Sequence, residues 1–194
     1  MRPFGSLNQR IPSRIASACL TAKAVAIAIA TALTLSVQAT AAEAEDIGML
    51  LQSGSYQEAL DRIDALPQES RAQPQMRLYH GMALMALDRR SDAMRSFEAL
   101  AAEHPEMPEP FNNMAVLQAA SGRYGDARVL LEQALRADAR YSVALENIGD
   151  VYIKLANQTY ARLRTLQPAR KSARKRHEAV QLISRVIDRP GSTK

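Results

Sequence analysis

The sequence predicts an all-α protein made of antiparallel helix hairpins that stack on one another. The 194 residues are 47% hydrophobic and only 5% aromatic, and their abundance of Ala and Leu favours helix over sheet. Small residues recur every 34 positions, at Ala59, Ala93, Ala127 and Ala161, and a fixed period of this length indicates a repeat architecture. Between these positions, apolar residues follow the spacing of amphipathic helices.

The first 41 residues are predicted to be a secretory signal peptide. Basic residues precede an apolar run at 24–37, and no acidic residue occurs before Glu43. Ala39 and Ala41 have the spacing of small residues that signal peptidase accepts, so cleavage is expected near Ala41 or Ala42. The run has 14 residues, fewer than the roughly 20 that a membrane-spanning helix needs. A periplasmic chain is therefore expected, with an uncleaved inner-membrane anchor as the alternative.

The clearest repeat unit covers residues 108–141. Its first half has an apolar face at helical spacing, and Gly122 ends this helix because glycine readily adopts a positive φ. Its second half, about 124–137, has a stripe of Ala and Leu. Two helices joined by so short a turn must lie antiparallel, and Ala115 and Ala127 let them approach closely. One hairpin cannot bury its own apolar stripe, so neighbouring units are expected to stack.

This pattern resembles the tetratricopeptide repeat (TPR), a helix-turn-helix unit of 34 residues. Units are expected at about 42–73, 74–107, 108–141 and 142–168, of which the first and last are imperfect. The matching residues are Gly81, Ala93, Phe97 and Pro105 in the second unit, Ala115, Ala127 and Leu131 in the third, and Gly149 and Ala161 in the fourth. The resemblance implies a right-handed superhelix whose inner groove, lined by the first helix of each unit, binds peptides or proteins.

The last unit departs from this pattern. Thr165 stands where a large apolar residue is expected, and the second helix, "QTYARLRTLQP", is expected to be short and to end near Pro168. Residues 169–188 are then expected to form a terminal helix that caps the stack, and residues 189–194 a disordered tail. The expected packing face of the terminal helix consists of Ala173, Val180, Ile183 and Ile187.

Charge is distributed unevenly along the expected mature chain. Residues 42–160 contain 11 Lys and Arg against 18 Asp and Glu, whereas residues 161–194 contain 10 against 2. The terminal helix begins with a basic patch that consists of Arg170, Lys171, Arg174, Lys175 and Arg176. This patch is either a solvated helix face or a surface that contacts anionic membrane headgroups or an acidic partner. Nucleic acid is not expected as a partner, because the patch has no aromatic residues for base stacking.

The candidate partner-binding groove lies on the first helices of the third and fourth units. Its residues are Glu109, Asn112, Asn113 and Val116 on one helix, and Glu146, Asn147, Asp150 and Lys154 on the next. Asn suits a peptide groove because its amide both donates and accepts hydrogen bonds; the alternative is an ordinary solvated surface. The acidic residues favour a ligand of basic or amide-rich character over a C-terminal carboxylate.

Catalysis and metal binding receive no support from the sequence. His80, His104 and His177 are far apart in the repeat plan and lack the spacing of metal ligands. The only cysteine, Cys19, lies in the segment that is expected to be removed. We therefore expect a non-catalytic protein-interaction scaffold without metal or cofactor. Likeness to TPR segments of bacterial envelope proteins suggests a role in cell-envelope biogenesis. The alternative is a structural protein docked on a membrane through its basic terminal helix or its uncleaved N-terminus.

Overall fold

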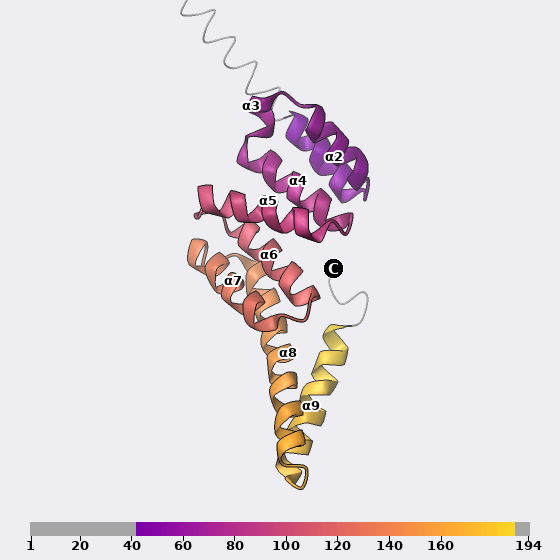
Figure 1. The fold of residues 1–194 in the computed structure, drawn as a ribbon, viewed down its shortest axis with the longest axis vertical. Coiled ribbons are helices and arrows are strands. Elements are labelled where there is room, and N and C mark those ends of the chain that lie inside the picture. Colours follow the sequence, from indigo (N-terminus) through magenta and orange to yellow (C-terminus); the bar gives the residue numbers. More distant parts are fainter. Residues whose placement is uncertain (1–41, 189–194) are drawn as a thin grey trace, which may run out of the picture. The chain divides into compact units, whose positions relative to one another are not determined.

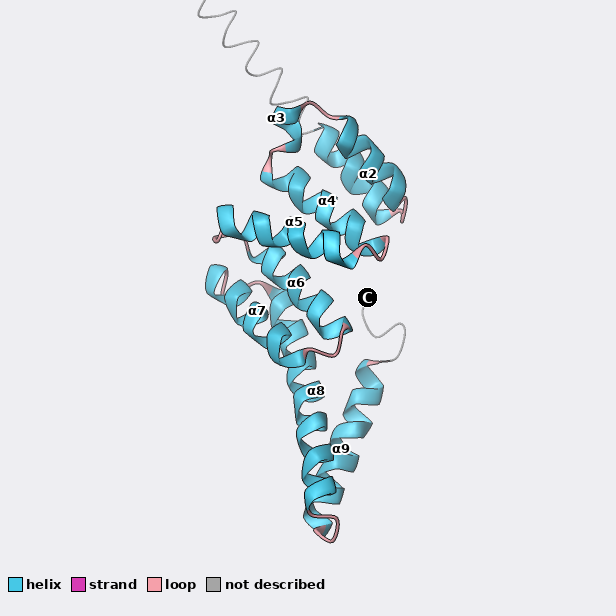
Figure 2. Cartoon of the chain, in the orientation of Figure 1, coloured by secondary structure: helices cyan, strands magenta, loops and turns pink. Residues whose placement is uncertain are grey.

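A computed structural model describes residues 42–188, except for the side chain of Ile187, and these residues are helical apart from their turns (Figure 2). The expected signal peptide at 1–41 and the expected tail at 189–194 lie outside the described residues. The chain divides after Asp46 into two compact units. The packing below therefore concerns residues 47–188, which belong to the second unit.

The helices follow one another as a series of hairpins. After a helical stretch at residues 42–52 come α2 (Tyr56–Ala65), α3 (Gln68–Arg71), α4 (Pro74–Ala86), α5 (Arg90–Glu103), α6 (Pro108–Ala120), α7 (Tyr124–Ala137), α8 (Ser142–Leu166) and α9 (Lys171–Ile187). From α4 onward each helix packs against the next (Figure 1), and α4 also contacts α6, which in turn contacts α8. This arrangement confirms the predicted all-α stack of antiparallel helix hairpins.

Three turns within the hairpins share one backbone conformation. Gly54, Asp88 and Gly122 have positive φ angles of 82°, 59° and 74°, and they are 34 residues apart. In each turn the amide of the next residue donates a hydrogen bond of 2.9 Å to the carbonyl five positions back, which is the Schellman geometry that ends a helix. Glycine adopts this conformation freely, and Asp tolerates it better than most residues. The chain therefore reverses direction at one fixed position in each unit.

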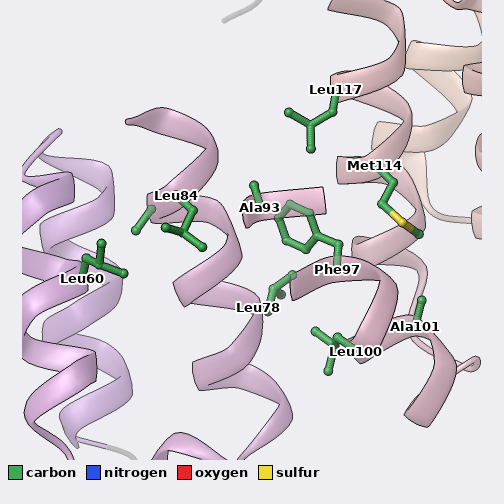
Figure 3. Close-up of a cluster of buried hydrophobic side chains, with 10 residues drawn as sticks. Leu60, Leu78, Leu84, Ala93, Phe97, Leu100, Ala101, Met114 and Leu117 are labelled. Carbon is green, nitrogen blue, oxygen red and sulfur yellow. The ribbon is translucent and has the colours of Figure 1, made fainter. Parts of the chain in front are cut away.

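Small residues allow the paired helices to approach closely. A Cβ atom placed on Gly81 of α4 would lie only 2.5 Å from Cε1 of Phe97 on α5, so the aromatic ring fills the space that the glycine leaves. Phe97 is fully buried in the core between α2, α4, α5 and α6 (Figure 3). One repeat later, Ala115 and Leu131 are buried together in the core of the next hairpin. The 34-residue period thus repeats a small residue facing a large one.

The fourth turn does not form, and the predicted short second helix "QTYARLRTLQP" is wrong. The residue 34 positions after Gly122 is Ala156, and α8 continues through it as one helix of 25 residues. Alanine has the highest helix propensity, and a side chain with a Cβ atom makes a positive φ unfavourable. Gly149 and Thr165 consequently lie on the same helix, and a Cβ atom on Gly149 would meet nothing within 4 Å.

The partner of α8 is α9, which returns along it (Figure 1). In the connecting turn, the Arg170 amide donates to the Gln167 carbonyl at 3.1 Å. The turn from α5 to α6 and the turn from α7 to α8 contain a bond of the same kind and length. The last hairpin is therefore joined by a connection of the type that elsewhere separates one unit from the next.

The buried face of α9 differs from the predicted one. Ala173, His177 and Ser184 are buried, whereas Ile183 is 49% exposed, so its predicted packing role is wrong. Lys154 of α8 explains the difference, because its ammonium group donates hydrogen bonds of 3.2 Å to Ser184 and of 2.5 and 2.6 Å to the Asp188 carboxylate. These polar bonds orient the serine side of α9 towards α8 and leave its isoleucine side exposed.

The close approach of Gly81 and Phe97 can be tested by adding one methyl group. Gly81→Ala is expected to lower the free energy of unfolding by about 1–3 kcal/mol, because the methyl group overlaps the ring in a filled core. The matched change Gly149→Ala is expected to raise it by up to about 1 kcal/mol, because it removes a glycine from a helix interior where the space is open. Urea denaturation followed by circular dichroism measures both variants. Similar effects at the two positions would contradict this account of the packing.

Candidate functional site

The predicted groove residues lie on α6 and α8, which contact each other in the stack. Two of them bind one another: the Asn147 side-chain amide donates to the Asn112 side-chain oxygen at 2.8 Å. Asn112 is only 4% exposed, and a buried amide needs such a partner. This bond joins the two helices, so the principal role of the Asn112 side chain is structural.

Lys154 is also engaged within the chain. Its ammonium group lies between α8 and α9, where it binds the Asp188 carboxylate and the Ser184 hydroxyl. The bond from Lys154 lowers the pKa of Asp188 below its usual value, because it stabilises the charged carboxylate. The one cation among the predicted groove residues is therefore neutralised by α9.

Three carboxylates remain on this surface, and we name Glu109, Glu146 and Asp150 the acidic face. Burial raises the pKa of Asp150, and the neighbouring carboxylates Glu146 and Asp188 raise it further, against the opposing effect of Lys154. At the start of α8, burial and the nearby Glu109 raise the pKa of the Tyr141 hydroxyl. Negative charge is thus concentrated where the protein supplies few cations, and such a surface favours a positively charged ligand.

The other two predicted groove residues do not alter this picture. Asn113 is half-buried and Val116 is 38% exposed on α6. An amide and a small apolar surface beside the acidic residues suit a polypeptide, because peptides present both amide groups and aliphatic side chains. Direct binding by these residues stays a prediction.

A hollow of about 790 Å³ lies elsewhere, between α2, α3, α4 and α5. No motif pointed to it, because its polar residues come from four separate elements. They are Asp64, Arg71, Arg77, His80, Arg89, Asp92, Arg95 and Glu103.

Most charges in this hollow are already paired. Arg77 binds Glu103 at 3.0 Å, Arg89 binds Asp92 at 2.9 Å, and Arg95 also contacts Asp92. Burial lowers the pKa of His80, against the opposing effect of Asp64, so the imidazole is neutral at pH 7. Only the acidic face therefore shows a marked excess of one charge, and it remains the stronger candidate of the two.

The basic patch lies on the first half of α9, and each of its residues is exposed. It belongs to a larger region, the basic hairpin end, which we define as residues 155–177 of α8 and α9. This region contains seven Lys and Arg, all exposed, and no Asp or Glu. The patch residue Arg174 has a carboxylate nearby, that of Glu178 at 3.7 Å, and such an exposed pair contributes little to stability.

Neither a metal centre nor a membrane span is found in residues 42–188. No three His, Cys, Asp or Glu side chains in this range are grouped as metal ligands. The helices of the same range include none that combines the length and the apolar character needed to cross a bilayer.

Comparison with known proteins connects this architecture to one family. Residues 84–146, from the end of α4 to the start of α8, match a family model described as tetratricopeptide repeat. The NMR structure of the first TPR domain of the human RPAP3 protein is similar in fold, with a TM-score of 0.54 and 15% sequence identity, over 62% of this chain and 94% of that domain. Among curated proteins the comparison finds no significant match. The repeat match and the stacked hairpins together show that the chain belongs to the tetratricopeptide repeat family.

Proposed function

We propose that this chain is a non-catalytic protein-binding scaffold whose acidic face holds a basic or amide-rich segment of its partner. Tetratricopeptide repeat domains act in protein-protein interaction, and the repeat match and the fold support the same role here. The observation that carries the choice of site is the position of Asp150. Its carboxylate is partly buried beside Glu146 and Asp188, while the adjacent Lys154 is bound to Asp188.

A cationic ligand would correct this local imbalance. An incoming Lys or Arg can form charge-assisted hydrogen bonds with Glu146 and Asp150, and such bonds are stronger than those between neutral groups. The bond between Asn112 and Asn147 supports the site from behind, because it fixes α6 against α8 beside Glu146. The face is thus held in shape before the partner arrives, which reduces the entropy lost on binding.

The proposed location is the bacterial periplasm, and the proposed setting is cell-envelope biogenesis. The location rests on the expected signal peptide at 1–41, and cell fractionation with N-terminal sequencing tests it. We expect a soluble periplasmic pool whose first residue is near Ala42. A chain that keeps residues 1–41 and stays in the inner-membrane fraction would instead support the anchored alternative.

Charge reversal on the acidic face tests the binding role. The double variant Glu146→Lys/Asp150→Lys is expected to retain its partner at least about tenfold less well, because the loss of even one charged hydrogen bond of about 1.4 kcal/mol has this effect. The measurement is affinity capture from an envelope extract with quantitative mass spectrometry, supported by circular dichroism to show normal helix content.

The matched control is Glu98→Lys/Asp126→Lys, which makes the same change in charge at exposed positions of α5 and α7. This variant is expected to capture the partner like the unmodified chain. An equal loss in both variants would attribute the effect to net charge and would count against the acidic face.

The electrostatics of the face can be measured directly at Asp150. Glu146→Gln is expected to lower the pKa of Asp150, because it removes a neighbouring negative charge, whereas Lys154→Gln is expected to raise it. Because the pKa of Asp150 is higher in the folded state than in the unfolded state, stability decreases as the pH rises through this range, and Glu146→Gln should reduce that decrease. NMR titration of the side-chain carboxyl carbons gives the pKa in each variant. An unchanged value in Glu146→Gln would disprove the coupling.

A further inference from the structure

The side of α9 that faces away from α8 is not covered by another helix of the stack (Figure 1). Because Ala173, His177 and Ser184 pack on α8, helical periodicity places another set of residues on the opposite side. We name this set the outer strip of α9: Lys171, Lys175, Leu182 and Val186, flanked by Arg176 and Ile183. Its apolar members are exposed, Leu182 by 65%, Val186 by 55% and Ile183 by 49%.

The outer strip changes character along its length. Its first half is basic and adjoins the basic hairpin end, where seven exposed Lys and Arg face no acidic residue of residues 155–177. Its second half is apolar. Leu166, at the far end of α8, adds another apolar side chain among these basic residues and is 70% exposed. From Lys171 to Val186 the strip extends over about 22 Å, at the usual rise of a helix.

We propose that the outer strip of α9 and the basic hairpin end dock on the surface of an anionic lipid bilayer. The helix lies in the plane of the membrane surface, as interfacial amphipathic helices do. Its Lys and Arg groups bind the negatively charged headgroups, while Leu182, Ile183 and Val186 enter the boundary with the acyl chains. The bond between Lys154 and Asp188 keeps α9 on α8, so the strip continues to face outward when the protein docks.

Charge and area favour a lipid surface over other occupants. A second copy of the chain would bring another basic hairpin end, and the three apolar residues are few for a specific protein interface, which typically buries about 1,200–2,000 Å². Nucleic acid would bind the basic half but would gain nothing from the apolar half, and the strip has no aromatic side chain on which bases could stack. An anionic bilayer takes up both halves at once.

This inference goes beyond the proposed scaffold role, because it concerns α9 and not the acidic face. It predicts that the full-length chain binds vesicles that contain one part phosphatidylglycerol to three parts phosphatidylcholine more tightly than vesicles of phosphatidylcholine alone. Near an anionic surface each basic residue contributes about fivefold to binding. The variant Lys171→Gln/Lys175→Gln/Arg176→Gln is therefore expected to lose on the order of 100-fold of the preference for phosphatidylglycerol vesicles.

A matched control separates the strip from net charge. Replacement of three exposed arginines of the body, Arg89, Arg90 and Arg95, by Gln removes the same charge and is expected to leave the preference unchanged. The apolar run at 24–37 is present in every variant, so its own contribution to vesicle binding is constant. The apolar half is tested by Leu182→Ser/Val186→Ser, which is expected to weaken binding at high salt, where the electrostatic attraction is screened.

A local probe reports contact with the bilayer even if residues 24–37 hold the chain on the vesicle. An environment-sensitive fluorophore attached at Leu182→Cys, in a Cys19→Ser background, is expected to shift to an apolar spectrum only with phosphatidylglycerol vesicles. The same fluorophore at Glu98→Cys is expected not to shift. Three results would overturn the proposal: equal binding to both vesicle types, an unshifted spectrum at position 182, or a dimer in sedimentation that Leu182→Ser/Val186→Ser abolishes without any lipid preference.

Discussion

The stack depends on one backbone constraint, a turn with positive φ at the same place in successive units. At Gly54, Asp88 and Gly122 the chain satisfies this constraint and reverses direction. Only after the reversal can a small residue of one helix face a large residue of the next, as Gly81 faces Phe97. Ala156 occupies the following position of the series, and there the helix continues. The regular hairpins therefore end at α7, and the long α8 extends beyond them with α9 as its partner.

The sequence was sufficient to predict the hairpins but not the place where they stop. Amphipathic spacing and residues 34 positions apart predicted the all-α stack, and both features describe how helices pack. In the last unit Gly149 and Ala161 keep the register, which suggested another hairpin. A small residue permits close approach, however, and does not cause the chain to reverse. The reversal depends on the turn, and the series that ends in Ala156 becomes visible only once Asp88 is recognised as the equivalent of the two glycines.

The candidate site was predictable at the level of helices and less so at the level of side chains. The repeat plan placed the groove residues on α6 and α8, where the structure has them. Which of them are engaged within the protein depends on partners distant in sequence: Asn112 binds Asn147, and Lys154 binds Asp188 on α9. The same long-range bond explains why a count of apolar residues misjudged α9. Such pairs have no local pattern, because each requires the packed arrangement of two helices.

The uninterrupted α8 also separates two regions of opposite charge. Asp150 of the acidic face and Leu166 at the far end of the helix are about 24 Å apart along the helix axis. This distance is about three times the Debye length at physiological ionic strength, roughly 8 Å, so each region acts on its ligand nearly independently of the other. A basic segment can therefore approach Glu146 and Asp150 without strong repulsion from the basic hairpin end. The same distance leaves that end free to contact an anionic surface while the acidic face is occupied. The absence of a single turn at Ala156 thus gives one small helical chain two separate charged surfaces.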